Sequence, residues 1–557
     1  MPTDCISYQN SGYFSSLIND YLDKKNNLQS LYNRFPNLEN FEAQIVEKEI
    51  NFNGNGNSNG NFNGNVNGNV NGNFNGNVNG NEKRKILVSV LEKQYAKIST
   101  SETTLNNIKL LNHSNTFTVT TGHQLNLFSG PLYFLYKIIS TINLTKELKA
   151  KYPTQNFVPI YWMATEDHDF DEINYFNFKG RKFRWNAASS GPVGRLSTEG
   201  LAAFFEVFAH GLDSGKNAET IKKLFQESYL NHFNLADATR FLANALFGEY
   251  GLVILDADNQ DLKRTFIPYL KEELTQQTSC KKVLETTERL KNYRIQVNPR
   301  EINLFYMEDD LRERIILENE TYKVNNTEIE FSETEILELL ENQPEKFSPN
   351  VILRPLYQEV ILPNLCYIGG GGEIAYWLEL KSFFDAVNVT FPILLLRNSA
   401  LLVTEKQAKK ADKLGLSWSD LFSKQNDLVN KKTAELSKFP IDFSTQKEHL
   451  RKQFEALLEI ASQTDKSFLG AVKAQEAKQT KGLENLEKRL LKAQKRNYSE
   501  TLERITTLQN ELFPNKSLQE RQANFSEFYL ENGENLLPQL CNELKPLENN
   551  FNIIVIS

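Results

Sequence analysis

A dense group of acidic side chains follows one apolar segment of the sequence. Residues 157–163 are mostly apolar, and Glu166, Asp167, His168 and Asp169 come directly after them. Carboxylates with a histidine can hold an ammonium group, bind Mg²⁺ or act as a general base toward an amine. We therefore treat these four residues as candidate catalytic or amine-binding residues. The alternative is a solvated loop that caps the next helix, because charged runs are usually exposed.

A second group of polar residues lies in the stretch TTGHQLNLFSGPLYFLYK, residues 120–137. The pattern predicts a strand, a polar loop and a helix with Ser129 as its N-cap and Pro131 in its first turn. Such a helix start directs free N–H groups toward the loop, which favours phosphate or carboxylate. The candidate binding residues are Gly122, Gln124, Asn126 and Ser129, and His123 is a candidate catalytic residue that could also bind this group. An ordinary strand-to-helix turn is the alternative, because no Walker or GxGxxG pattern is present.

The third candidate region lies in residues 348–398. Arg354 and Gln358 are one helical turn apart, so both could face a pocket and clamp a carboxylate. The run Gly369–Gly372 predicts a flexible loop that lets a ligand approach the backbone, followed by a helix. The candidates from this loop and helix are Gly370, Gly371, Glu373, Tyr376 and Trp377. Cys366 lies nearby without an assignable histidine partner, so we expect it in the core.

These regions need a scaffold that brings them together, and the hydrophobic pattern indicates one. Apolar runs near residues 117–120, 157–163, 251–256 and 391–396 have the length and composition of strands buried on both faces. Helical patterns alternate with them, which is typical of an α/β fold with a mostly parallel sheet. Ligands bind at the carboxyl ends of the strands in such sheets, so we expect the polar loops to line one site.

Other segments are expected to be additions to this core. Residues 197–248 are predicted to be mainly helical, and residues 293–330 to be an antiparallel insertion. Residues 402–512 show approximate heptad spacing with a register slip near Tyr498, which predicts a helical hairpin or coiled coil. Residues 551–556 could return to the core as an edge strand.

The predicted division of the chain includes one unusual tract, residues 51–81. It has no charge and is rich in Asn and Gly, which predicts a disordered insertion. A small β-solenoid or an aggregation-prone segment are the alternatives. The other predicted parts are an N-terminal helical segment (1–50), the first part of the core (82–196), a strand-helix unit with connector insertions (197–347), the second part of the core (348–400), a helical coiled-coil domain (401–515) and a C-terminal return to the core (516–557).

The composition excludes several classes of protein. A net charge of −7 and a pI near 5.7 argue against a surface built for nucleic acid. The four cysteines are far apart and form no CxxC, which fits a reducing cytosol and gives no zinc motif. We find no signal peptide, and the apolar runs are shorter than the ~20 residues of a membrane span. We expect a cytoplasmic protein without nucleic-acid or membrane partners.

Three long motifs occur in order along the chain: TTGHQLNLFSGPLYFLYKI, PIYWMATEDHDFDEIN and SPNVILRPLYQEVILPNLCYIGGGGEIAYWLEL. Followed by a coiled-coil pattern, they make the chain resemble the BshC family, the cysteine ligases of bacillithiol synthesis. The resemblance covers essentially residues 83–557 and part of the N-terminus. It implies a Rossmann-like, nucleotidyltransferase-like core with inserted connector segments, and a coiled-coil domain that supports a homodimer.

The resemblance also implies a reaction, in which L-cysteine is joined through its carboxyl group to the amine of glucosaminyl-malate in the last step of the pathway. Amide formation needs an activated carboxyl group, so ATP or ADP is the expected cofactor and Mg²⁺ a candidate metal. Gly122-His123 lies where related synthetases keep an HxGH motif, but no KMSKS-like loop precedes the coiled coil. Adenylation and phosphorylation of the carboxyl group both stay open.

The expected role of each candidate group follows from its charge. The loop after residue 120 would bind the activating phosphate or the malyl carboxylates, and Arg354 with Gln358 would clamp a carboxylate. The acidic group would hold an amine, with His168 or Asp169 as the base. The glycine loop would close the pocket. Two other functions stay open: a synthetase-like enzyme that activates another amino acid or acts on an RNA, and a non-catalytic coiled-coil scaffold.

Overall fold

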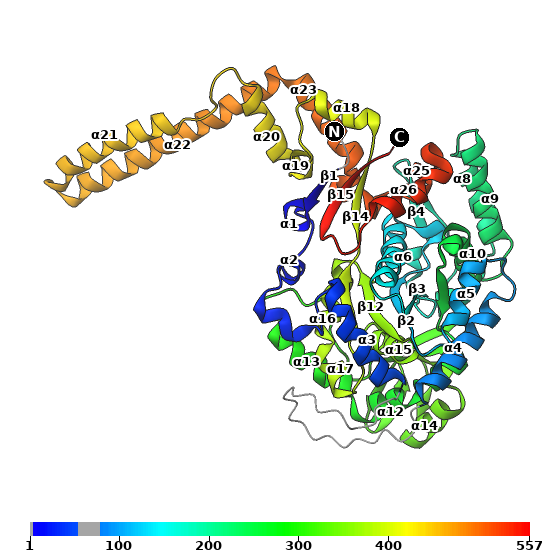
Figure 1. Cartoon of the computed structure of the whole chain (residues 1–557). Coiled ribbons are helices and arrows are strands. Elements are labelled where there is room, and N and C mark those ends of the chain that lie inside the picture. Colours follow the sequence, from blue (N-terminus) through cyan, green and yellow to red (C-terminus); the bar gives the residue numbers. More distant parts are fainter. Residues whose placement is uncertain (1–3, 54–77, 557) are drawn as a thin grey trace.

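The structure, a computed structural model, describes residues 4–53 and 78–556 (Figure 1). The predicted Asn/Gly-rich tract lies largely outside these residues. Its two ends belong to helices, α3 (Leu38–Asn53) and α4 (Gly80–Tyr95). No helix in the described part of the chain combines the length and the apolar character needed to cross a membrane.

A five-stranded parallel sheet forms the centre of the molecule, in the order β13-β12-β2-β3-β6. The strands are β2 (Thr116–His123), β3 (Asn156–Met163), β6 (Val253–Asp256), β12 (Asn364–Gly369) and β13 (Ile393–Leu396). In chain order this is 5-4-1-2-3, the strand order of a Rossmann-like sheet read from the opposite edge. The direction of chain progression reverses between β2 and β12, where a ligand site is expected.

Three helices that precede or follow these strands in the chain contribute residues to the site described below. They are α6 (Tyr133–Lys151), α15 (Leu353–Ile361) and α16 (Gly371–Glu379). The start of α6 differs from the prediction, because Ser129 has a φ of 65° and does not cap the helix. The side chain of Asn524 holds this turn by donating to the carbonyls of Phe128 and Gly130 at 2.8 and 2.7 Å.

The two insertions have the predicted secondary structure. Helices α8 (Leu201–His210), α9 (Lys216–Phe225) and α10 (Leu235–Phe247) occupy the first. The second forms a five-stranded antiparallel sheet, β10-β9-β8-β7-β11. Its strands are β7 (Leu304–Glu308), β8 (Leu311–Glu318), β9 (Thr321–Val324), β10 (Glu330–Phe331) and β11 (Phe347–Pro349).

The last strand, β15 (Asn550–Ile556), is central in its sheet and not an edge strand as predicted. It pairs in parallel with β14 (Ser399–Thr404) and antiparallel with β1 (Asp4–Ser7), so both ends of the described chain meet there (Figure 1). The apolar residues of β15 predict a strand with a buried face. They do not predict its two neighbours, β1 and β14, which come from distant parts of the chain.

A helical hairpin of α21 (Ser444–Ser462) and α22 (Lys466–Asn497) projects from the body of the molecule (Figure 1). Its own apolar core is small and centres on Phe454, Ala461 and Val472. The predicted register slip coincides with a break at Tyr498, where α22 ends and α23 (Ser499–Leu512) begins.

Candidate active site

A pocket of about 830 Å³ lies at the carboxyl ends of β2, β3 and β12. Its walls come from the loops after these strands, from α15 and α16, and from the antiparallel insertion. The pocket lies next to the point between β2 and β12 where the order of the strands along the chain reverses. The polar loops after the strands predicted a site at this end of the sheet.

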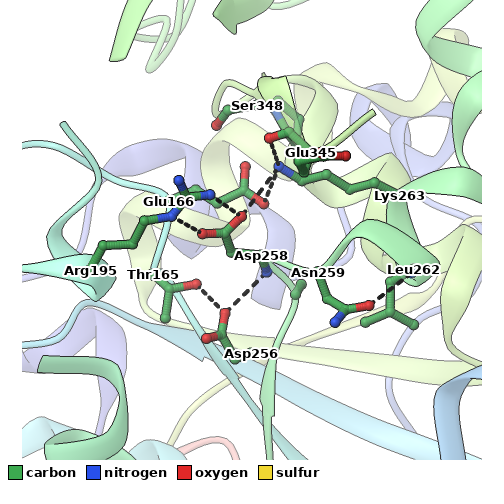
Figure 2. Close-up of polar contacts among 12 residues, drawn as sticks. Thr165, Glu166, Arg195, Asp256, Asp258, Asn259, Leu262, Lys263, Glu345 and Ser348 are labelled. Atoms are coloured by element: carbon green, nitrogen blue, oxygen red, sulfur yellow. Dashed lines mark hydrogen bonds and ion pairs between the residues drawn. The ribbon is translucent and has the colours of Figure 1, made fainter. Parts of the chain in front are cut away.

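Glu166 forms the acidic wall of the pocket and is backed by a buried ion-pair network (Figure 2). Lys263 Nζ lies 3.3 Å from Glu166 Oε1 and 3.6 Å from Asp258 Oδ1, and Arg195 holds Asp258 through two hydrogen bonds of 2.9 and 3.0 Å. Glu166 Oε2 is buried, with no hydrogen-bond partner among the described residues. Burial raises the pKa of Glu166, while Lys263 opposes that rise. Glu166 can therefore accept a hydrogen bond or a proton from a ligand.

The neighbouring Asp167 and His168 are held by two other pocket residues. Gln124 donates to Asp167 Oδ2, and Arg312 donates to His168 Nδ1 at 2.5 Å. Burial and Arg312 lower the pKa of His168, so its imidazole is neutral with the proton on Nε2. His168 could act as a base only after Arg312 moves away from Nδ1.

Three of the residues predicted in the loops after β2 and β3 do not line the pocket. Asp169 is exposed and precedes the short helix α7 (Phe170–Ile173). Asn126 donates to the Glu172 carbonyl at 3.1 Å, and Ser129 is buried in the turn before α6. Of the candidates in the first loop, only Gly122, His123 and Gln124 line the pocket. The chain turns after them at Phe128 and Ser129, whose φ values are 49° and 65°.

Arg354 also lines the pocket. Its Nη1 donates to Gln358 Oε1 at 3.0 Å, and its Nη2 lies 3.5 Å from the Tyr376 hydroxyl. Gln358 is fully buried behind Arg354, so it positions the guanidinium and does not reach the pocket. Within the described residues, no carboxylate forms an ion pair with Arg354. A partly buried cation without a counter-ion favours an anionic ligand.

The absence of a side chain at Gly122 lets Tyr367 and Arg354 lie close to the end of β2. A Cβ atom at Gly122 would lie 3.1 Å from the Tyr367 hydroxyl and 3.9 Å from Arg354 Nη1. Its carbonyl accepts a hydrogen bond of 2.6 Å from Lys137, whose Nζ also lies 2.6 Å from Glu373 Oε2. Burial acts to raise the pKa of Glu373, but Lys137 holds it below its usual value. Lys137 and Glu373 therefore join β2 to α16 as a neutral pair.

The aromatic candidates separate into lining and supporting residues. Tyr376 lines the pocket, whereas Trp377 is fully buried and packs behind Tyr367 with ring centroids 4.7 Å apart. His123 lines the pocket as well, and its Nε2 has no partner in the described part of the chain. Burial lowers the pKa of His123 far below its usual value, so this imidazole is neutral.

Several residues of the site were absent from the sequence-based candidates: Lys137, Arg312, Arg397 and Arg521, which line the pocket, and Lys263, which lies behind Glu166. Two had a usable signal, since Lys137 closes the first motif and Arg397 directly follows the buried strand β13. Arg312 and Arg521 enter from the antiparallel insertion and the C-terminal segment, and Lys263 lies on α11 (Gln260–Arg264) after β6. No local pattern marks these three residues.

The residues fit an oxyanion such as a carboxylate or a nucleotide phosphate, because Arg354 lacks a counter-ion and α16 begins at the pocket. A metal is a different case. Residues 4–53 and 78–556 contain no group of three or more His, Cys, Asp and Glu arranged to hold a metal ion.

Comparison with known proteins identifies the family. The model for "Bacillithiol biosynthesis BshC, N-terminal Rossmann-like domain" matches residues 1–398, and the model for its "C-terminal coiled-coil domain" matches residues 400–556. Proteins named "Putative cysteine ligase BshC" from Flavobacterium johnsoniae, Flavobacterium psychrophilum and Christiangramia forsetii are 69%, 65% and 56% identical. These alignments cover 100% of this chain and 99–100% of each relative. The chain therefore belongs to the BshC family of bacillithiol biosynthesis.

Proposed function

We propose that this protein joins the carboxyl group of L-cysteine to the amine of glucosaminyl-malate, using ATP, in the last step of bacillithiol biosynthesis. One observation supports this most directly. Among the residues that the structure describes, one pocket holds a buried carboxylate oxygen without a hydrogen-bond partner, Glu166 Oε2, and an arginine without an acidic partner, Arg354. Both substrates carry amino and carboxylate groups, so this pairing of charges suits them.

The residues have separate tasks in this proposal. Arg354 binds a carboxylate, and Gln358 fixes its guanidinium. Glu166 accepts a proton from the incoming ammonium group, because only the neutral amine can attack a carbonyl carbon. When bound, ATP supplies the activation that turns the carboxyl oxygen into a leaving group. The attack then forms the C–N bond and breaks the bond to the activated oxygen.

We also propose a cytoplasmic location and a homodimer formed through the coiled coil. All four cysteines are free thiols, and the substrates belong to the synthesis of a low-molecular-weight thiol. Mg²⁺ would accompany the nucleotide through its phosphates, because magnesium sites commonly use one or two carboxylates plus substrate oxygens.

The test is an assay of the purified protein with L-cysteine, glucosaminyl-malate and ATP, read by mass spectrometry for bacillithiol, ADP and AMP. We expect product, with AMP indicating adenylation and ADP indicating an acyl-phosphate route. Glu166→Gln and Arg354→Met should each lower kcat/KM roughly 100-fold, because each loses a buried charged interaction. The matched controls Glu500→Gln and Arg504→Met on α23 should keep wild-type activity, since both residues are exposed.

The absence of product from folded protein would contradict the proposal. Salt-dependent binding of an RNA would then support the alternative of a synthetase-like enzyme. Wild-type turnover by Glu166→Gln and Arg354→Met would contradict the assigned roles while leaving the reaction itself in place.

A further inference from the structure

We propose that the start of α16, Arg397 and Arg521 form a second oxyanion subsite at one end of the pocket. It would take a carboxylate or phosphate group, separate from the group bound at Arg354. This inference rests on the proposed function and adds where a second anionic group of its substrates binds.

The first turn of α16 provides backbone donors. Gly370 precedes the helix in an extended conformation, with φ −74° and ψ 171°, and its own N–H donates to Glu373 Oε2 at 2.8 Å. The N–H groups of Gly371 and Gly372 belong to the first turn, where no intrahelical acceptor exists. Gly370, Gly371 and Gly372 all line the pocket, and a Cβ at Gly372 would meet no heavy atom within 4 Å. The helix start therefore lines the pocket and is open around Gly372.

Arg397 provides an independent sign of a ligand. The residue is 4% exposed, and its Nη1 and Nη2 lie 3.1 and 2.7 Å from the two carboxylate oxygens of Glu520. Its remaining donor, Nε, is buried without a partner among the described residues. That atom lies 3.8 Å from the position that a Cβ of Gly370 would occupy. Glu520 therefore holds the Arg397 guanidinium in place, and the Nε–H of Arg397, which has no partner among the described residues, lies next to the start of α16.

Arg521 gives the subsite its net charge. Glu520 neutralises Arg397, and Glu373 neutralises Lys137. Arg521 is exposed, lines the same pocket, and forms no ion pair within the described residues. Its positive charge and the dipole of α16 are therefore available to an anion. Because Glu520 and Arg521 follow the coiled coil in the chain, the C-terminal domain completes this end of the pocket.

The binding experiment uses calorimetry on the full-length protein with malate, inorganic phosphate and ADP as separate probes. Gly371→Pro removes one backbone donor, and the extended Gly370 before it suits proline at the first helical position. Gly371→Ala is its matched control, because its added Cβ meets the same neighbour, Ile18, at 3.4 Å but keeps the N–H. Arg521→Gln is paired with Arg504→Gln on α23. Thermal melting checks that each variant is folded.

We expect Gly371→Pro and Arg521→Gln to weaken at least one probe ~10-fold, while both controls bind like the wild type. Weakening of phosphate and ADP alone would assign the subsite to the nucleotide, and weakening of malate alone to a substrate carboxylate. The inference is overturned if the wild type binds no probe, or if the two variants bind all probes unchanged. Since binding needs no turnover, a protein that binds the probes but makes no bacillithiol contradicts only the proposed function.

Discussion

Lys263 is the residue on which the charge of Glu166 depends. It is almost fully buried and contacts Glu166 and Asp258, while Asp258 has a second cation in Arg195 (Figure 2). Removing Lys263 therefore leaves Asp258 paired and Glu166 unpaired. Without this cation, burial and the nearby Asp258 would raise the pKa of Glu166 further and favour its protonated form.

We predict that Lys263→Met lowers kcat/KM roughly 100-fold, because a protonated Glu166 cannot accept the proton of an ammonium group. If Lys263 acts through Glu166, the double variant Lys263→Met/Glu166→Gln should be no slower than Glu166→Gln alone. A double-mutant cycle measures this, with Lys346→Met as a control lysine paired to Glu308 outside the pocket. Additive losses would show that Lys263 acts independently of Glu166.

Among the elements, α16 links the pocket to the connector insertion. At its C-terminal end, Glu379 accepts the N–H groups of Gln296 and Val297 at 2.7 and 3.4 Å. Gln296 and Val297 line the pocket. Burial raises the pKa of Glu379 to about 7, although the two N–H groups oppose this rise. The helix therefore holds a pocket wall through a carboxyl group that titrates near neutral pH.

The sign of the resulting pH effect follows from this pKa. The folded protein holds the Glu379 proton more tightly than the unfolded chain, whose glutamates titrate at about 4.3. The free energy of unfolding should therefore decrease as pH rises from about 5 to 7 and change little from this group above that. We predict that Glu379→Gln, which resembles the protonated form, makes this decrease smaller. Denaturant unfolding across that pH range would test it. An unchanged slope relative to wild type and the exposed control Glu500→Gln would contradict the prediction.

In the whole molecule, the helical hairpin stands apart from the pocket (Figure 1). Its described residues include exposed apolar side chains that its own small core does not cover, such as Ile460, 59% exposed, and Leu486, 51% exposed. A hairpin with this surface is suited to pairing with a second copy.

We predict that the wild type has twice the 64.0 kDa chain mass in solution and that Ile460→Asp/Leu486→Asp is monomeric. Buried aspartates would carry an unpaired charge into the interface, which is costly. Size-exclusion chromatography with light scattering measures the mass, and Lys473→Asp on the exposed surface of α22 is the control. A wild-type mass of one chain would contradict the predicted dimer.

The sequence alone determined the kinds of element and their order. Strand-length apolar runs, polar loops after them and the long helical segment are local patterns, and each is fixed by residues close together in the chain. The same patterns predicted that the loops around Gly122, Glu166 and Gly370 would meet, because parallel strands end at one edge of a sheet. The family followed from three motifs in order.

Only the tertiary structure decided which side chains share the pocket. Arg312 and Arg521 come from the antiparallel insertion and the C-terminal segment, and their approach depends on packing between segments distant in sequence. Packing between distant segments also makes β15 a central strand, because β1 and β14 pair with it on either side. The sequence also did not predict which way neighbouring side chains point, since Tyr376 faces the pocket while Trp377 packs in the core. The spacing of residues along the chain predicts which side chains lie on the same face of a helix or strand. Which other segment packs against that face depends on the whole fold.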